Sequence, residues 1–97
     1  MAQVIYSHRS IGDLERLAEF LLEVAPDSVQ SAMEAIIEAL GVLERHPLLG
    51  RRGDGESREL VISRGATGYV ALYRFSPSAD TVRILRIRHQ RELGFVD

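Results

Sequence analysis

Histidine and arginine are the residues of this sequence whose side chains could transfer protons or stabilise negative charge. The three histidines are His8, His46 and His89, and all 12 strong cations are arginines, because lysine is absent. An imidazole has an unperturbed pKa of about 6.5, so it can act as a base or an acid near neutrality. No histidine stands at a fixed metal-ligand spacing from carboxylates, and cysteine is absent. We therefore predict no metal site and no cofactor.

The charges are unevenly distributed, although the formal net charge is only -2. Acidic residues dominate the first half, whereas arginines gather from position 58 onward. A nearly neutral total argues against direct nucleic-acid binding by the isolated protein. The distribution has two interpretations: an acidic helical surface beside an arginine-rich sheet, without a ligand, or a charged surface that binds a partner. The arginines concerned are Arg58, Arg64, Arg74, Arg83, Arg86, Arg88 and Arg91.

The length of 97 residues suits one domain, which we place at residues 1–97. No segment is apolar for long enough to cross a bilayer, and the N-terminus lacks the basic region and apolar core of a signal peptide. The absence of cysteine rules out disulfides and fits a reducing compartment. We therefore expect a soluble cytoplasmic protein that does not associate with a membrane.

Two helices are expected in the first half of the chain. Ser10 is predicted to cap the first, with Asp13 as the acidic partner of a capping box, and Pro26 ends it. Asp27 is predicted to cap the second, which Pro47 closes. The short link between them makes an antiparallel helical hairpin. Apolar stripes at helical spacing support both helices: Ile11, Leu14, Leu17, Ala18, Leu21 and Leu22 in the first, and Val29, Met33, Ile36, Leu40 and Leu43 in the second.

The remaining segments have the composition of strands and loops. Residues 4–6 form a short strand before the helices, and residues 49–57 are glycine-rich and charged, which is typical of a loop. Residues 58–63, 69–75 and 81–89 are predicted strands, and their short connections make an antiparallel meander. The order β-α-α-β-β-β predicts an α+β domain in which an antiparallel sheet is packed by the N-terminal helical hairpin.

Strand alternation gathers tyrosines and arginines on one face of the meander if Phe75 lies opposite Val82. The opposite face is the more aliphatic, so we expect it to pack on the helices and the tyrosine–arginine face to be exposed. Tyrosine and arginine are favoured anchors of protein interfaces, and they also suit RNA. We favour a protein interface over an ordinary strand surface, and that surface over an RNA site. The predicted exposed face contains Tyr69, Ala71, Tyr73, Phe75, Val82, Ile84, Arg86 and Arg88, and the predicted packing face contains Val70, Leu72, Leu85 and Ile87.

Four short motifs in the second half resemble those of ParE-type plasmid-stabilisation toxins. They are Pro47-x-x-Gly50-Arg51, Arg58-Glu59-Leu60, Gly68-Tyr69-x-x-x-Tyr73-Arg74 and Ile84-Leu85-Arg86-Ile87-x-His89-x-Arg91. With the two upstream helices, the resemblance covers nearly the whole chain. It implies a growth-inhibiting toxin that a small antitoxin, encoded beside it, neutralises. In that superfamily the RelE branch cleaves messenger RNA in the ribosomal A site, whereas characterised ParE members poison DNA gyrase.

Departures from the RelE pattern favour the ParE branch. RelE-type nucleases resemble this chain at Gly68-Tyr69, but the next residue in them is an arginine, whereas here it is Val70. The predicted strand 58–63 also lacks the lysines that those nucleases carry on the first strand of the meander. Metal-free RNA cleavage needs a base, an acid and a cation for the phosphate. His89 aligns with a terminal-strand histidine of some nuclease relatives, so His89, Arg58 and Arg74 are the candidates if the protein is a nuclease. The alternatives to a non-enzymatic gyrase inhibitor are therefore a ribosome-dependent endoribonuclease and an inactive homologue that only binds its antitoxin.

The resemblance also implies a partner, a ParD-like antitoxin. We expect an acidic, amphipathic segment that folds as it binds. Arginine pairs well with carboxylates, and the apolar stripe of either helix offers a groove wherever the hairpin is not covered. The predicted partner- or target-binding residues are Tyr69, Tyr73, Arg86, Arg88 and Arg91.

Overall fold

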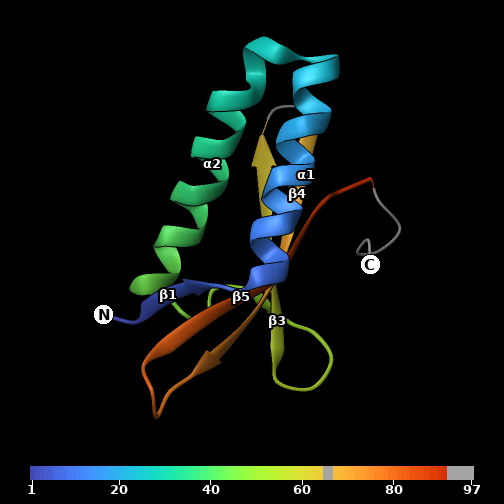
Figure 1. The fold of residues 1–97 in the computed structure, drawn as a ribbon. Coiled ribbons are helices and arrows are strands. Elements are labelled where there is room, and N and C mark those ends of the chain that lie inside the picture. The colour runs from blue at the N-terminus through green and yellow to red at the C-terminus, as the bar shows by residue number, and fades with distance from the viewer. Residues whose placement is uncertain (65–66, 92–97) are drawn as a thin grey trace.

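A computed structural model describes residues 1–64 and 67–91, and its elements confirm the predicted α+β class. Strand β1 (Gln3–Tyr6) leads into helix α1 (His8–Val24), a 3-10 helix (Pro26–Ser28) and helix α2 (Val29–Gly41). A further 3-10 turn (Val42–Glu44) precedes strands β2 (Arg51–Arg52), β3 (Ser57–Arg64), β4 (Thr67–Ser76) and β5 (Thr81–His89). The helices form a hairpin over one face of the sheet, and the β4–β5 hairpin extends past them (Figure 1). Within the described residues, no helix is both long and apolar enough to cross a membrane.

The sheet is mixed rather than purely antiparallel, which differs from the prediction. Its strand order is β1-β5-β4-β3-β2; β1 runs parallel to β5, whereas the other three pairs are antiparallel. A parallel pair requires a long connection, and the helical hairpin and the meander together provide one. The second difference is β2, a two-residue strand inside the segment predicted to be only a loop.

Helix α1 begins earlier than predicted, because Ser7 caps it and Ser10 does not. The Ser7 hydroxyl accepts a hydrogen bond from the Ser10 backbone N–H at 3.1 Å and donates one to the Leu85 carbonyl at 2.9 Å. Ser10 lies within the helix and is buried. Both serines suit a cap by type, and it is the contact of Ser7 with β5 that ties the start of the helix to the sheet.

The ends of the two helices agree with one prediction and correct two others. Helix α1 stops just before Pro26, as expected. The predicted cap at Asp27 is wrong, because Asp27 lies in the 3-10 helix and Ser28 occupies the N-cap position of α2 without a side-chain hydrogen bond. Helix α2 also ends well before Pro47, so that proline does not terminate it.

The register of the β4–β5 pair near the turn is the one assumed in assigning the two faces, and it changes further along. Phe75 lies opposite Val82. The register then shifts between Leu72 and Tyr73, because β5 contains one additional residue there, a β-bulge. The bulge moves Ile87 onto the face that carries the tyrosines.

The tyrosine-bearing face of the sheet is buried under the helices, so the prediction that it is exposed is wrong. Tyr73 is 0% exposed and Tyr69 is 3% exposed. An aromatic ring buries more apolar surface than the valines and leucines of the other face. Burial of a tyrosine is favourable where its hydroxyl group forms a hydrogen bond. The core unites both helices with this face of the sheet, through Leu17, Ile36, Leu40, Leu43, Leu60, Ile62, Tyr69, Ala71, Tyr73, Val82, Ile84 and Ile87.

Candidate functional site

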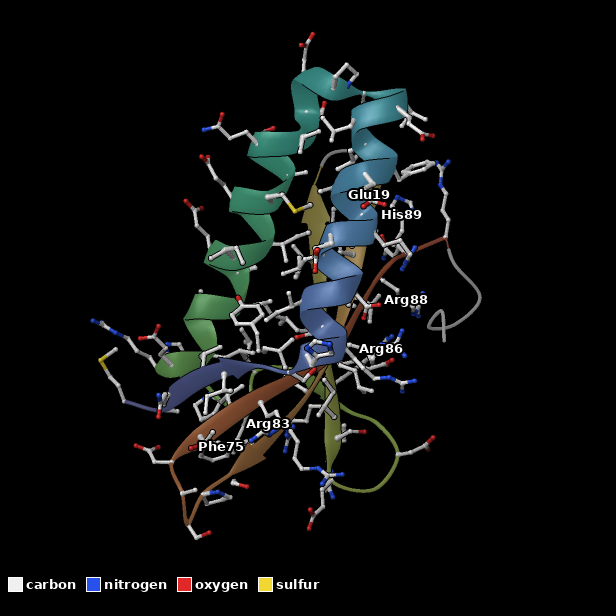
Figure 2. All side chains as sticks on the ribbon, viewed as in Figure 1. Glu19, Phe75, Arg83, Arg86, Arg88 and His89 are labelled. Carbon is white, nitrogen blue, oxygen red and sulfur yellow. The ribbon has the colours of Figure 1, made fainter. Side chains whose placement is uncertain are left out.

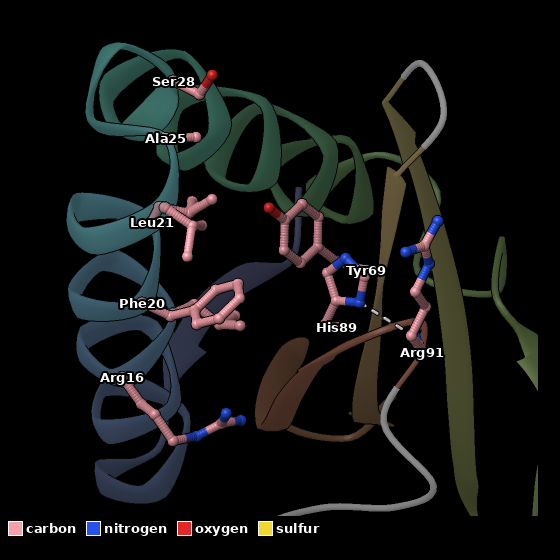
Figure 3. A pocket seen from close by; sticks show the side chains of 10 residues that line it. Arg16, Phe20, Leu21, Ala25, Ser28, Tyr69, His89 and Arg91 are labelled. Atoms are coloured by element: carbon pink, nitrogen blue, oxygen red, sulfur yellow. Dashed lines mark hydrogen bonds between the residues drawn. The ribbon is translucent and has the colours of Figure 1, made fainter.

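A groove with a volume of about 650 Å³ opens between α1 and the strands β4 and β5 (Figure 3). The C-terminal half of α1 and the link to α2 form its helical wall, and β4, β5 and the turn after β5 form its sheet wall. We call it the α1 groove. Its lining, which is mostly apolar, consists of Arg16, Leu17, Phe20, Leu21, Val24, Ala25, Ser28, Tyr69, His89 and Arg91.

Phe20 and Val24 give the α1 groove an accessible apolar wall. Their side chains are 54% and 60% exposed, and they stand one helical turn apart. Phe20 points across the hollow toward Tyr69 and His89 (Figure 3). Scattered exposed apolar residues are ordinary on a protein surface, whereas adjacent ones beside a groove mark an interaction site.

The sheet wall of the α1 groove is positioned by contacts among its own residues. The rings of Tyr69 and His89, which are paired across β4 and β5, meet edge to face with 5.5 Å between centroids and 87° between planes. The Arg91 backbone N–H donates a hydrogen bond to Nδ1 of His89 at 3.1 Å. The neutral imidazole therefore carries its proton on Nε2.

Positive charge accompanies the apolar lining of the α1 groove. Arg16 projects from α1, and Arg91 follows β5. Among the described residues that line the groove there is no carboxylate. The surface therefore complements a segment that combines apolar side chains with acidic ones, because its aliphatic and aromatic groups are desolvated while its carboxylates meet arginine.

Arg86, a predicted partner-binding residue, forms a buried ion pair with Asp13 of α1 instead. Its Nε and one Nη donate to the two Asp13 carboxylate oxygens at 2.9 and 3.0 Å, and the Ile87 backbone N–H donates to the same carboxylate at 2.8 Å. Arg86 is 8% exposed and lies beside α1 (Figure 2). Asp13 is thus not the capping-box residue that the sequence predicts: it joins α1 to β5 at the bulge.

Tyr73, another predicted binding residue, holds the loop before β2. Its hydroxyl donates to the Pro47 carbonyl and accepts from the Gly50 N–H, both at 2.8 Å. A Cβ on Gly50 would lie 2.6 Å from the Tyr73 ring, so only glycine permits this approach. Arg58 donates to the Gly50 carbonyl at 2.9 Å. Burial raises the pKa of Tyr73, while the Gly50 hydrogen bond and the Arg58 charge lower it by less. Motif residues recognised in the sequence thus form one structural unit.

The three residues proposed for a nuclease do not converge. His89 lies opposite Tyr69, and Arg74 follows five residues further along β4, about 17 Å away at the rise of a strand. Arg58 lies opposite Tyr73, whose side chain faces the core, so alternation turns Arg74 to the other face of the sheet. A base and a phosphate-binding cation at these positions cannot act on the same phosphodiester.

The five predicted binding residues likewise have different environments: Arg91 is exposed, Arg88 is half-buried, and the remaining three are buried, namely Tyr69, Tyr73 and Arg86. Tyr69 and Arg91 line the α1 groove. Arg88 is half-buried, and its guanidinium donates to the His89 and Gln90 carbonyls at 3.3 and 3.4 Å. Tyr73 and Arg86 are engaged in the interior contacts described above.

The sequence predicts a groove along a helix but not the residues that make it accessible. The predicted apolar stripe of α1 does not include Phe20 and Val24. They lie beside Leu17 and Leu21 at helical spacing, so the apolar face of α1 is wider than the part of it that packs against the sheet. That excess width was the available signal.

Comparisons with known proteins agree with this architecture. The family model described as ParE toxin of type II toxin-antitoxin system, parDE, matches residues 4–94. Toxin RelE3 of Caulobacter vibrioides is 41% identical over 92 residues, which are 95% of this chain and 98% of that protein. Toxin RelE2 of the same organism is 30% identical over 93 residues, covering 96% and 100%.

Two solved structures have a similar fold. The chromosomal ParDE system from P. aeruginosa matches with a TM-score of 0.76 at 20% identity, covering 92% of this chain and 96% of that one. The RelBE2 toxin-antitoxin complex from Mycobacterium tuberculosis matches with a TM-score of 0.60 at 28% identity, covering 94% and 93%. The chain therefore belongs to the ParE toxin family, within the ParE/RelE superfamily of type II toxins.

Proposed function

We propose that this protein is a cytoplasmic toxin whose α1 groove binds an acidic, amphipathic segment of a cognate antitoxin of the ParD type. The observation that carries the proposal is the exposed pair Phe20 and Val24 beside Arg16 and Arg91, in a groove lined by no described carboxylate. The two similar solved structures are both described as toxin–antitoxin systems or complexes, which supports a partner of this kind.

The open edge of β3 supports an extended partner segment next to the groove. Within residues 1–64 and 67–91, β2 pairs only with Arg58 and Glu59, so positions 60–64 have no strand on that side. Ile62 on this edge lies opposite Tyr69, a residue of the groove. Unpaired strand edges accept added strands. One segment that fills the groove and continues along β3 would bury apolar surface and satisfy backbone groups together.

The antitoxin proposal predicts a short open reading frame next to this gene, and co-expression of its product tests the proposal. We expect this second protein to rescue growth and to co-elute with the toxin on size exclusion. Binding to the folded state alone would also raise the melting temperature of the toxin in a concentration-dependent way. A harmless monomeric product that the neighbouring protein leaves unchanged would refute the proposal.

For the target we propose DNA gyrase, inhibited without enzymatic chemistry. The separation of His89 from Arg58 and Arg74 and the presence of Val70 support this proposal against a nuclease. Induction without antitoxin should arrest growth and cause filamentation, and purified protein should inhibit supercoiling. Supercoiling that persists in a large excess of the protein would exclude gyrase as the target.

The alternative is ribosome-dependent cleavage of messenger RNA, and the names of the two Caulobacter relatives, both RelE toxins, favour considering it. His89 would then serve as acid or base, and because Nδ1 already accepts a hydrogen bond, Nε2 is the nitrogen available for it. Primer extension after induction would reveal cuts at codon boundaries. A His89→Gln variant with full toxicity would exclude a proton-transfer role.

A further inference from the structure

We propose that the outer face of the β4–β5 hairpin is a second protein-docking surface, which binds an acidic segment through Arg74 and Arg83. The two arginines are directly opposite each other in the register of these strands, and both are exposed. Alternation directs them away from Tyr73 and Val82, which face the core. At paired positions their Cβ atoms are about 5 Å apart, so both guanidinium groups can reach one bound group.

Neither guanidinium is neutralised by the part of the chain that the structure describes. Across residues 1–64 and 67–91, Arg74 and Arg83 have no ion pair and no side-chain hydrogen bond. Glu59, which lies opposite the β4 residue Leu72, is bonded to Arg51 at 3.3 Å. Like charges directly opposite each other repel, so an anion that binds between them relieves the repulsion and gains two charge-assisted contacts.

The surroundings of the pair indicate a protein rather than a nucleic acid. A hollow of about 320 Å³ is lined by the two arginines, by the aliphatic residues Ile5, Ala79 and Leu85, and by the hydroxyl-bearing Ser76 and Thr81. Among the described residues, no aromatic side chain lines it, whereas single-stranded nucleic acids are recognised by stacking on aromatic platforms. Aliphatic lining residues beside two arginines suit a segment with an aliphatic side chain between carboxylates.

This surface is separate from the α1 groove, because the groove lies on the helix-covered face of the sheet. In Figure 2, Arg83 lies on the projecting hairpin, away from Arg86 and Arg88 beside α1. An occupied groove therefore leaves the hairpin surface accessible. The inference does not depend on the antitoxin proposal, and its test requires neither toxicity nor an antitoxin.

The test is fluorescence polarisation with the purified full chain and a labelled ten-residue peptide in which Glu and Leu alternate with Ser. We expect saturable binding that weakens with salt, since the contacts are between exposed charges. The double variant Arg74→Gln/Arg83→Gln should lose affinity at least about tenfold. The matched control, Arg45→Gln/Arg52→Gln, removes the same charge from exposed arginines elsewhere and should bind within about twofold of the unaltered protein.

Three outcomes would overturn the proposal. One is equal loss of affinity in the two double variants, which would mean nonspecific attraction. Another is unchanged binding of a peptide with Gln in place of Glu. The third is an oligouridine probe that binds more tightly than the peptide and loses affinity only in the Arg74/Arg83 variant, which would identify a phosphate-bearing partner. Circular dichroism and urea unfolding of each variant verify that the fold is retained.

Discussion

The α1 groove and the interior contacts of Tyr73 and Arg86 are built from the same residue types on the same strands, yet they serve different ends. Tyr69 and Tyr73 share one face of β4, but Tyr69 lies at the groove beside His89, whereas the hydroxyl of Tyr73 is enclosed by backbone partners. Arg86 is likewise enclosed by a carboxylate of α1. The type of residue is therefore a poor guide to its role, which depends on the partners that the fold brings to each side chain.

The two regions should respond differently to substitution. A buried polar group loses its partners when the interior is altered, so the cost is in the free energy of unfolding. An exposed apolar group contributes little to folding, and its loss should lower affinity for a partner instead.

The largest effect is expected from Asp13→Asn, which leaves the Arg86 guanidinium buried without its carboxylate. We expect the free energy of unfolding to fall by about 3–5 kcal/mol. Urea unfolding followed by circular dichroism measures it, with Glu15→Gln on the exposed side of the same helix as a control within about 0.5 kcal/mol. Equal stability of the two variants would show that the ion pair does not hold α1 to β5.

The groove is tested by Phe20→Ser, which removes the large apolar group of the helical wall. Stability should change little, because 54% of the side chain is exposed. Affinity for the antitoxin should fall by about 2 kcal/mol, roughly 30-fold, as for an aromatic anchor of an interface. Isothermal titration calorimetry measures it against Ile37→Ser, an exposed residue of α2 outside the groove. If Phe20→Ser and Ile37→Ser bind the antitoxin with equal affinity, the antitoxin binds outside the α1 groove.

Much of the fold could be predicted, because periodicity and prolines report local structure directly. The helical hairpin and the end of α1 before Pro26 follow from such signals. The parallel pairing of β1 with β5 could not be deduced, because it depends on how distant segments meet. The sequence pattern also did not predict the β-bulge near Leu72. Its one additional residue changes which side chains share a face.

The candidate site was predicted only in part, for a related reason. A groove along an incompletely covered helix was expected, and Tyr69 and Arg91 do line one. The burial of Tyr73 and Arg86 depends on partners that are distant in sequence, namely the loop at Gly50 and the carboxylate of Asp13. Hydrogen-bond partners of this kind convert an expected surface residue into an interior one.

A smaller effect is expected from Tyr73→Phe, which keeps the ring and removes the hydroxyl. The Pro47 carbonyl and the Gly50 N–H lose their partner, so the free energy of unfolding should fall by about 1–2 kcal/mol. Chemical denaturation measures the change, and Tyr6→Phe is the control, since no hydrogen bond of that hydroxyl is found among the described residues. A loss no larger than that of the control would mean that the clamp on the loop is dispensable.

The smallest expected effect concerns stability in alkaline solution. The protein should lose stability as the pH rises, and Tyr73→Phe should reduce this loss. Burial raises the pKa of Tyr73 above its ordinary value of 10.0, and it raises that of Tyr6 as well. In the unfolded chain both phenols deprotonate at about 10. Above that pH the unfolded state therefore binds fewer protons than the folded state, and the free energy of unfolding falls until the folded pKa is passed.

Denaturation measured between about pH 8 and pH 11 detects this slope, which is set by the difference in bound protons between the two states. Tyr73→Phe should flatten it, although the contribution of Tyr6 remains, and the double substitution with Tyr6→Phe should flatten it further. If the slope were the same in all three proteins, neither phenol would be shielded from water as the packing requires. The alkaline lability would then arise elsewhere, and the enclosure of Tyr73 by Pro47 and Gly50 would be looser in solution.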